Sequence, residues 1–131
     1  METITITTIE NPDGRASLFG EEVYELEDFH GMLISDRQQT LNFRHRESEP
    51  GYSSTWHVAG DPTLIIVRQG KLRISLRDGS HRDFGAGDQF IARDFLAPGV
   101  EFDQSVHGHT AEVLGNVSFY AVHLKLGFAP S

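Results

Sequence analysis

The chain has 131 residues, of which 38% are hydrophobic and 23% charged, and it carries 19 acidic against 11 basic side chains. This length and composition predict a single soluble domain, 1–131, with one hydrophobic core. The formal charge of −8 argues against nucleic acid or a membrane as partner, and the absence of cysteine excludes disulfides, thiolate metal ligands and cysteine nucleophiles.

The N-terminal segment shows no targeting signal. Residues 1–6 lack a basic stretch followed by an apolar one, so we expect no signal peptide. No apolar run approaches the roughly 20 residues that cross a bilayer. We therefore expect a cytoplasmic protein.

The first half of the chain contains two segments that alternate with a period of two. Residues 3–7 alternate threonine and isoleucine, which are β-branched and favour a strand over a helix. Residues 41–44 alternate in the same way. Between them, the apolar spacing of residues 19–29 fits neither a strand nor a helix well, so both interpretations stay open there.

The second half contains shorter strands separated by turns. Residues 64–67 form a continuous β-branched apolar run, typical of a strand covered on both faces. Residues 71–77 alternate, which places their leucines and isoleucine on one face. Asp78 and Gly79 then predict a tight hairpin that returns through residues 81–84.

The remaining strands complete an all-β pattern. A glycine turn at residues 85–88 leads into a strand at 89–92, and residues 117–126 form the last predicted strand. Many short strands at near-regular spacing, without repeats or linkers, predict an all-β fold. A double-sheet jelly roll is the best match.

The glycine framework of residues 41–103 resembles that of the cupins, in particular a small subgroup with a Trp-His-x-Ala element. A Pro-Gly pair at 50–51 precedes Trp-His-Val-Ala at 56–59, and Gly70 and the Gly-Ala-Gly-Asp turn at 85–88 follow. The resemblance implies a cupin jelly roll, or double-stranded β-helix, that forms a barrel.

The first cupin motif is degenerate in this chain. Cupins usually hold a metal with three histidines and a carboxylate, and their first motif reads G-x5-H-x-H-x3,4-E-x6-G. Aligned on Gly70, it puts His57 at the first histidine, Ala59 at the second and Thr63 at the carboxylate. A divalent metal needs about three fixed N or O ligands. We therefore expect no metal and no other cofactor.

The second cupin motif leaves a choice of register. It begins at residues 87–88 and normally ends in a histidine shortly after a Pro/Gly turn, here 98–99. Depending on the spacing, that position holds Val100, Glu101 or Phe102. Glu101, if it points inward, would complete an atypical metal site with His57, which is an alternative to the metal-free interpretation.

His57 and Glu101 are the predicted catalytic residues. An imidazole with a pKa near 6.5 exchanges protons at physiological pH. In the implied barrel, Glu101 would orient that imidazole or act as the opposite acid. The alternative is a structural His57, hydrogen-bonded within the core.

The predicted ligand-binding residues are His45, Thr63, Phe102 and His123. Thr63 and Phe102 occupy motif positions. His45 continues the alternation of residues 41–44, and His123 lies in the last strand, so both are candidates to point inward. A hydrogen-bonded histidine at a strand end is the competing interpretation for each.

Other polar groups are expected at the surface. Ser105, Gly108 and Thr110 mark a loop around His107 and His109, so we expect these two histidines to be solvated. The arginines at 44, 46 and 68 have the planar fork that grips a carboxylate. In a chain this acidic, we expect them to pair with surface acids.

Together these observations predict a single-domain cupin that binds a small, partly polar organic molecule in its barrel. If the molecule is turned over, metal-independent proton transfer of the isomerase, epimerase, dehydratase or cyclase type fits His57 and Glu101 best. The alternatives are a metal-dependent oxygenase or isomerase with an atypical ligand set, and a non-catalytic binding or structural module. Cupins of this size are often dimers, and an unpaired edge strand at residues 3–7 needs covering, so we expect a homodimer.

Overall fold

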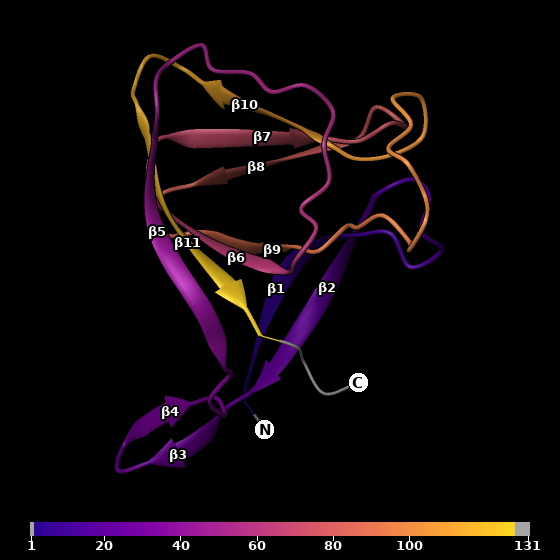
Figure 1. Ribbon diagram of the computed structural model, residues 1–131. Helices are drawn as coiled ribbons and strands as arrows, with labels where there is room; N and C mark the ends of the chain where they lie inside the picture. Colours follow the sequence, from indigo (N-terminus) through magenta and orange to yellow (C-terminus); the bar gives the residue numbers. More distant parts are fainter. Residues whose placement is uncertain (1, 128–131) are drawn as a thin grey trace.

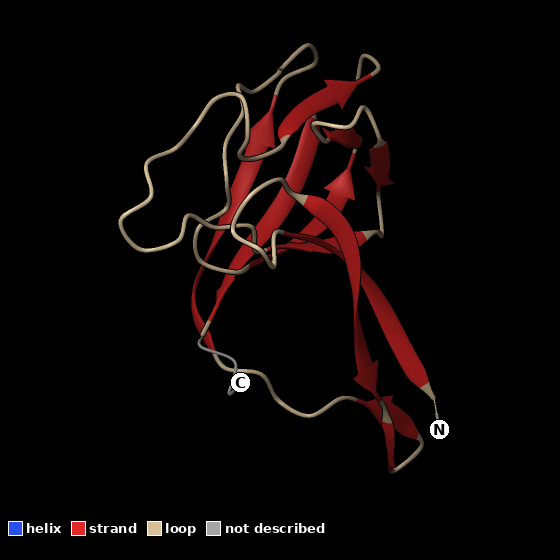
Figure 2. Ribbon diagram, turned by 90° about the vertical axis from the view of Figure 1, so that its right-hand side faces the viewer, coloured by secondary structure: helices blue, strands red, loops and turns tan. Residues whose placement is uncertain are grey.

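The computed structural model describes residues 2–127, and the regular secondary structure of this part is entirely β-strand (Figures 1 and 2). Between residues 2 and 127, no helix has the length and apolar character needed to cross a membrane. The strands are β1 (Thr3–Glu10), β2 (Leu18–Glu25), β3 (Glu27–Phe29), β4 (Met32–Ile34), β5 (Thr40–Ser48), β6 (Thr63–Gln69), β7 (Lys71–Ser75), β8 (His81–Gly85), β9 (Gln89–Ala92), β10 (Thr110–Leu114) and β11 (Phe119–Leu126).

Two sheets of different width make up the body of the molecule. The wide sheet has the order β2-β1-β9-β6-β11-β5, and the narrow sheet has the order β10-β7-β8. In Figure 1 the narrow sheet lies above the wide one, and the separate hairpin β3–β4 extends away at the bottom. This arrangement confirms the all-β jelly roll predicted from the sequence, built here from two separate sheets.

The core lies between the two sheets because period-two alternation turns one face of each strand toward the other sheet. Ile65 and Val67 of β6 share one apolar cluster with Leu72 and Ile74 of β7, and none of the four is more than 7% exposed. Burying each such side chain contributes about 1.5–3 kcal/mol. The predicted apolar face of residues 71–77 is therefore confirmed.

Residues 19–29, which the sequence left open between helix and strand, are strands. β2 pairs antiparallel with β1 along its whole length, from Thr3 opposite Glu25 to Glu10 opposite Leu18. The local sequence pattern does not decide between helix and strand here. Backbone hydrogen bonds to the neighbouring strand β1 do.

Contrary to the prediction, the strand that contains residues 3–7 is not an edge strand of its sheet, although residues 3–6 pair on one side only. β1 lies between β2 and β9, and it pairs with β9 in parallel, Thr7 opposite Phe90 and Ile9 opposite Ala92. Thr8 and Ile9 are fully buried. The outer strands of the wide sheet are β2 and β5 instead. Residues 3–5 are exposed and pair only with β2, so a contact between two copies through this stretch stays a prediction.

Candidate functional site

A cavity of about 230 Å³ lies between the two sheets. One part of its wall is apolar, and the other carries three histidines and two arginines. Its lining residues are Arg44, Arg46, His57, Val58, Ala59, Thr63, Ile65, Leu72, Ile74, Phe90, Ala92, His109, Ala111 and His123. The cavity therefore brings groups that bind or move protons against an apolar surface.

The segment after β5 runs beside β10 and carries His57 to the mouth of the cavity. The backbone N–H of His57 donates to the carbonyl of His109 at 3.0 Å, and the N–H of His109 donates back to the carbonyl of His57 at 2.9 Å. This reciprocal pair brings the two imidazole rings to 4.5 Å between centroids, at an angle of 58°. The two side chains are therefore neighbours at one site.

Asp94, fully buried next to His109, is the hydrogen-bonding centre of the site. Its Oδ2 accepts from Ser17 Oγ at 2.6 Å and from His109 Nδ1 at 2.7 Å, and its Oδ1 accepts from the Ala59 N–H at 2.9 Å. Burial by itself raises the pKa of the Asp94 carboxyl, but these hydrogen bonds, that of His109 first, lower the pKa below its ordinary value. Because an ionised carboxylate only accepts, Nδ1 of His109 carries a proton, and Nε2 is left for other contacts.

His57 is oriented from the opposite side, by a backbone group. Its Nδ1 lies 2.8 Å from the carbonyl oxygen of Thr55, which only accepts, so Nδ1 is the donor and Nε2 of the neutral ring carries the lone pair. Withdrawal of water lowers the pKa of His57, the Thr55 carbonyl partly opposes this, and His109 lowers the pKa further. His57 is therefore a neutral base near pH 7.

His123 lies beside the two arginines on the wall formed by β5 and β11. Arg44 is directly opposite His123 in the strand register, and Arg46 lies two residues farther along β5. The Nε2 atom of His123 is buried without a hydrogen-bond partner. Burial, then the charges of Arg46 and Arg44, lower the pKa of His123 to about 4. The imidazole is therefore neutral at physiological pH.

Three residues predicted from the sequence, His57, Thr63 and His123, line the cavity. Thr63 is the first residue of β6, and its hydroxyl donates to the carbonyl of Asp61 at 3.0 Å. The oxygen of that hydroxyl still has acceptor capacity. The structure therefore brings these three side chains to one cavity.

His45 does not line the cavity, contrary to the prediction. Because side chains alternate along β5, the inward positions of Arg44 and Arg46 turn His45 to the opposite face. There its exposed ring packs edge-on against Phe43, at 5.9 Å between centroids. The alternation was predicted correctly, but with the opposite face inward.

Glu101 and Phe102 also lie away from the cavity. Both belong to the loop between β9 and β10, where Glu101 is exposed. The ring of Phe102 packs against His107 at 5.9 Å between centroids, and the N–H of Asp103 donates to Nδ1 of His107 at 2.9 Å. Glu101 therefore does not share the cavity with His57, contrary to the prediction from the sequence.

Asp94 and His109 are the central residues that sequence reasoning missed. The prediction of a solvated loop is wrong, because His107 and His109 are only 5% and 4% exposed. His109 precedes Ala111 and Val113 by two and four residues, and both are buried in the core. Extending that alternation backward would have predicted an inward His109. Asp94 gives no comparable local signal, because its partners are distant in sequence.

A divalent metal of the kind that cupins hold does not fit this donor set. His57 and His109 each keep a free Nε2 atom, but two donors are fewer than the three or so that a divalent metal needs, and two guanidinium groups beside His123 repel a cation. In the described part of the chain, no three His, Asp or Glu side chains converge as metal ligands do. The motif positions of Ala59 and Thr63 supply no strong ligand either. The chemistry available is that of the imidazoles and guanidiniums themselves.

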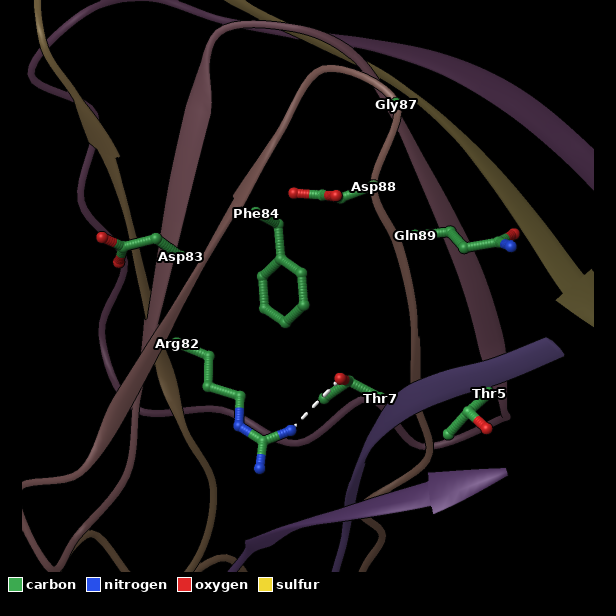
Figure 3. Close-up of a pocket in the computed structure, with 8 residues that line it drawn as sticks. All are labelled: Thr5, Thr7, Arg82, Asp83, Phe84, Gly87, Asp88 and Gln89. Atoms are coloured by element: carbon green, nitrogen blue, oxygen red, sulfur yellow. Dashed lines mark hydrogen bonds between the residues drawn. The ribbon is translucent and has the colours of Figure 1, made fainter. Parts of the chain in front are cut away.

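A wider hollow of about 480 Å³ lies between β1, β8 and β9 and is less suited to chemistry (Figure 3). Most of its polar side chains are exposed, and several are already hydrogen-bonded. Arg82 donates to the hydroxyl of Thr7 at 3.2 Å, and the carboxylate of Asp88 accepts from the N–H of Gly85 at 2.8 Å. The candidate site is therefore the cavity between the sheets.

Two solved structures are among those that are similar to this chain. One is a cupin-2 domain containing protein from Shewanella frigidimarina, at 21% identity and a TM-score of 0.42, over 65% of this chain and 69% of that chain. The other is a protein from Neisseria meningitidis, at 16% identity and a TM-score of 0.45, over 72% of this chain and 89% of that chain. No family model and no curated protein matches the chain. The jelly-roll assignment rests on the strand pairing described above.

Proposed function

We propose that the protein is a single-domain cupin that binds a small, partly polar organic molecule between its sheets and moves a proton on it without a metal. The observation that carries this proposal is the chain of contacts from Asp94 through His109 to His57. His57 acts as the general base, and His109 returns the proton. His109 has the role of the opposite acid, which was predicted for Glu101.

The protonation states of the two imidazoles support these roles. The lowered pKa of His57 keeps its Nε2 available as an acceptor near pH 7. Asp94 fixes the tautomer and orientation of His109 through the 2.7 Å hydrogen bond to Nδ1. Asp94 and His109 are both buried, so the hydrogen bond between them is stronger than it would be in water.

The reaction conserves protons and electrons. His57 removes a proton from a carbon next to a carbonyl group, and the electron pair moves onto the carbonyl oxygen. For the return step, His109 carries protons on both ring nitrogens, with Nδ1–H held by Asp94, and it delivers the Nε2 proton to a neighbouring atom or to the other face of the same carbon. The proton taken up by His57 then passes to Nε2 of His109, which restores the starting state. The outcome is isomerisation or epimerisation, and neither needs an oxidant or a reductant.

Proton exchange with solvent tests this proposal. Small ketones and keto acids, with acetone, dihydroxyacetone and pyruvate as first probes, are incubated in D₂O with chelator-treated protein and followed by proton NMR. We expect His57→Gln and His109→Gln each to slow the protein-dependent exchange at least about 100-fold, because general acid–base catalysis contributes about 10²–10⁴-fold. His45→Gln, on the opposite face of β5, is the matched control.

Equal exchange by the wild type and both cavity variants refutes the proton-transfer role. Binding of these probes without any exchange supports the non-catalytic alternative instead. Either result leaves the cavity as a ligand site but removes its proposed chemistry.

We also propose that the expected homodimer forms through the hairpin β3–β4. Phe29 is paired with Met32, and Glu27 with Ile34, so Phe29, Met32 and Ile34 share one face of the hairpin. These three side chains are 54%, 54% and 43% exposed. An apolar face of this kind is typical of a protein contact, and a second copy supplies the same face.

A further inference from the structure

We propose that the molecule bound in the cavity is an organic acid whose carboxylate lies between Arg44 and Arg46, next to His123. This inference rests on the proposed role of the cavity as a ligand site and adds the chemical class of the ligand. The carboxylate is held at the wall formed by β5 and β11. The body of the acid extends along the apolar wall toward His57 and His109.

The strand register gathers the three groups on one wall. Arg44 lies opposite His123, and Arg46 lies opposite Ala121, whose small side chain leaves room above the sheet. Because alternate residues of a strand share a face, both arginines line the cavity. Two cationic forks and one imidazole thus surround one part of the cavity.

Neither guanidinium has a carboxylate partner within residues 2–127. The ion pairs of this part of the chain involve other basic residues, although the chain carries 19 acidic side chains against 11 basic ones. The sequence-based prediction that these arginines pair with surface acids is therefore wrong for Arg44 and Arg46. Asp94, which is near the cavity, already accepts from Ser17, Ala59 and His109.

Arg46 is fixed in place by neutral groups. Its Nε donates to Ser48 Oγ at 2.9 Å, and its guanidinium carbon lies 5.1 Å and 5.3 Å from the ring centroids of Phe119 and Tyr52. Burial lowers the pKa of Arg46, which is the effect of a partly desolvated positive charge. A carboxylate would offset this cost and match the planar fork with two parallel hydrogen bonds.

His123 provides an independent sign of a missing partner. Its Nε2 is buried without a hydrogen bond, and an unpaired buried polar atom costs free energy. In the tautomer with a proton on Nε2, this atom donates to a carboxylate oxygen held by Arg44. The same anion would counter the two positive charges that now lower the pKa of His123.

A second hollow of about 230 Å³ extends the basic surface outward. It shares Arg44, Thr63 and His123 with the cavity and adds Asn42 and Lys125, although Lys125 is paired with Asp61 at 3.3 Å. Arg44 therefore lines both the cavity and this second hollow. An anion approaching along this side meets positive charge and hydrogen-bond donors before it reaches the cavity, which favours its entry.

The shape and lining of the cavity favour an organic acid over an inorganic anion. About 230 Å³ is less than the roughly 300–1,000 Å³ of pockets for drug-sized ligands, so the ligand is small. Beyond the arginines the wall is formed by residues such as Ile65, Leu72, Ile74 and Phe90. These surfaces suit a carbon skeleton and leave the charge of a phosphate largely unmatched.

Titration calorimetry with matched acids and amides tests the proposal. The probes are hexanoate and benzoate, their neutral counterparts hexanamide and benzamide, and inorganic phosphate. We expect each carboxylate to bind at least tenfold more tightly than its amide and than phosphate. Equal affinity for acid and amide, no binding of either carboxylate, or tighter binding of phosphate overturns the proposal.

Substitutions locate the binding to the two arginines. Arg44→Gln and Arg46→Gln are each expected to weaken carboxylate binding at least tenfold, and Arg46→Lys to restore only part of the loss, because lysine lacks the fork. Arg68→Gln, an exposed arginine outside the cavity, is the matched control. Arg44 is also exposed, so Arg44→Gln keeps the test valid if Arg46→Gln does not fold. Unchanged affinity in folded Arg44→Gln protein overturns the proposal.

The two proposals fail separately. If carboxylates still bind to His57→Gln protein and the wild-type protein exchanges no proton of any probe, the proton-transfer proposal is refuted and the anion site stands. If proton exchange is unaffected by Arg44→Gln and Arg46→Gln and acids bind no better than amides, the anion site is refuted and the proton-transfer proposal stands.

Discussion

A Cβ atom placed on Gly108 would lie 2.5 Å from the carbonyl oxygen of His57. Gly108 also has a φ of +91°, a conformation that side chains disfavour. The close approach allows the reciprocal backbone hydrogen bonds that set His57 beside His109. The glycine between two histidines is therefore a requirement of the site.

Gly108→Ala is expected to destabilise the protein more than the same change at an open turn. Positive φ alone costs about 1–2 kcal/mol, and the contact with His57 adds to it. Gly79, with a φ of +87° and nothing within 4 Å of an added Cβ, is the matched control. Urea unfolding should give a loss of about 3 kcal/mol or more for Gly108→Ala and about 1–2 kcal/mol for Gly79→Ala. Equal losses would mean that the close approach carries no cost.

Asp94→Asn is expected to cost stability and to release His109. The carboxylate is fully buried and accepts three hydrogen bonds, so its replacement by an amide leaves donors facing donors. We expect a loss of about 2–4 kcal/mol in the free energy of unfolding. Nitrogen-15 NMR of the imidazole should show that the Nδ1–H tautomer of His109 no longer predominates.

Ser17→Ala is expected to destabilise the protein less than Asp94→Asn. It removes one neutral donor to Asp94 and should cost about 1 kcal/mol, with the tautomer of His109 unchanged. A tautomer of His109 that is the same in Asp94→Asn and wild-type protein would contradict the orienting role of the carboxylate.

His123 should make the protein less stable in mild acid. The unfolded chain protonates this imidazole near pH 6.5 and the folded chain only near pH 4. Between these values the unfolded state binds more protons, so the free energy of unfolding falls as the pH is lowered. The full shift corresponds to about 3 kcal/mol, and partial solvation of the side chain reduces it to roughly 1–3 kcal/mol.

Thermal unfolding between pH 7 and pH 4 checks this expectation. His123→Gln should flatten the pH dependence, leaving a smaller slope from His57, whose pKa is also lowered. His81→Gln, at an exposed position, should leave the slope as it is. A slope unaffected by His123→Gln would show that this imidazole is accessible to protons in the folded state.

The hairpin β3–β4 should control the oligomeric state. Replacing Phe29, Met32 and Ile34 together by serine removes the exposed apolar face, and light scattering at micromolar concentration should then give a monomer mass. Leu33→Ser, on the other face of the hairpin, should leave the dimer intact. A wild-type monomer at that concentration would rule out the proposed dimer.

The positions of the strands could be predicted from the sequence better than their pairing in the sheets or the face that each turns inward. Local alternation is enough to identify β7, because each residue of a strand reports its own face. The same alternation in β5 was assigned the wrong face, which put His45 inward in place of the two arginines. No local signal tells that β1 pairs with β9, which is distant in sequence. The strand expected at an edge of the sheet is therefore paired on its second side as well, through residues 7–9.

The candidate site was predicted in part for the same reason. His57 was found through a motif whose glycines fix its place in the chain. Its neighbours were not, because Ser17, Asp94 and His109 meet only when three separate loops and strands converge. Glu101 was favoured because one register of the second motif puts it at the histidine position, and the turn at Asp103 directs it away from the cavity.

The parallel pairing of β1 with β9 has a consequence for how the chain reaches its native state. β1 is synthesised well before β9 and pairs early with β2, since their hairpin is local. Its other neighbour is synthesised much later, so the free edge of that hairpin must wait for β9. Long-range strand pairing of this kind is slow and leaves backbone groups open to other chains meanwhile. During synthesis, the edge of β1 that later pairs with β9 is therefore the part of the wide sheet most open to pairing with other chains.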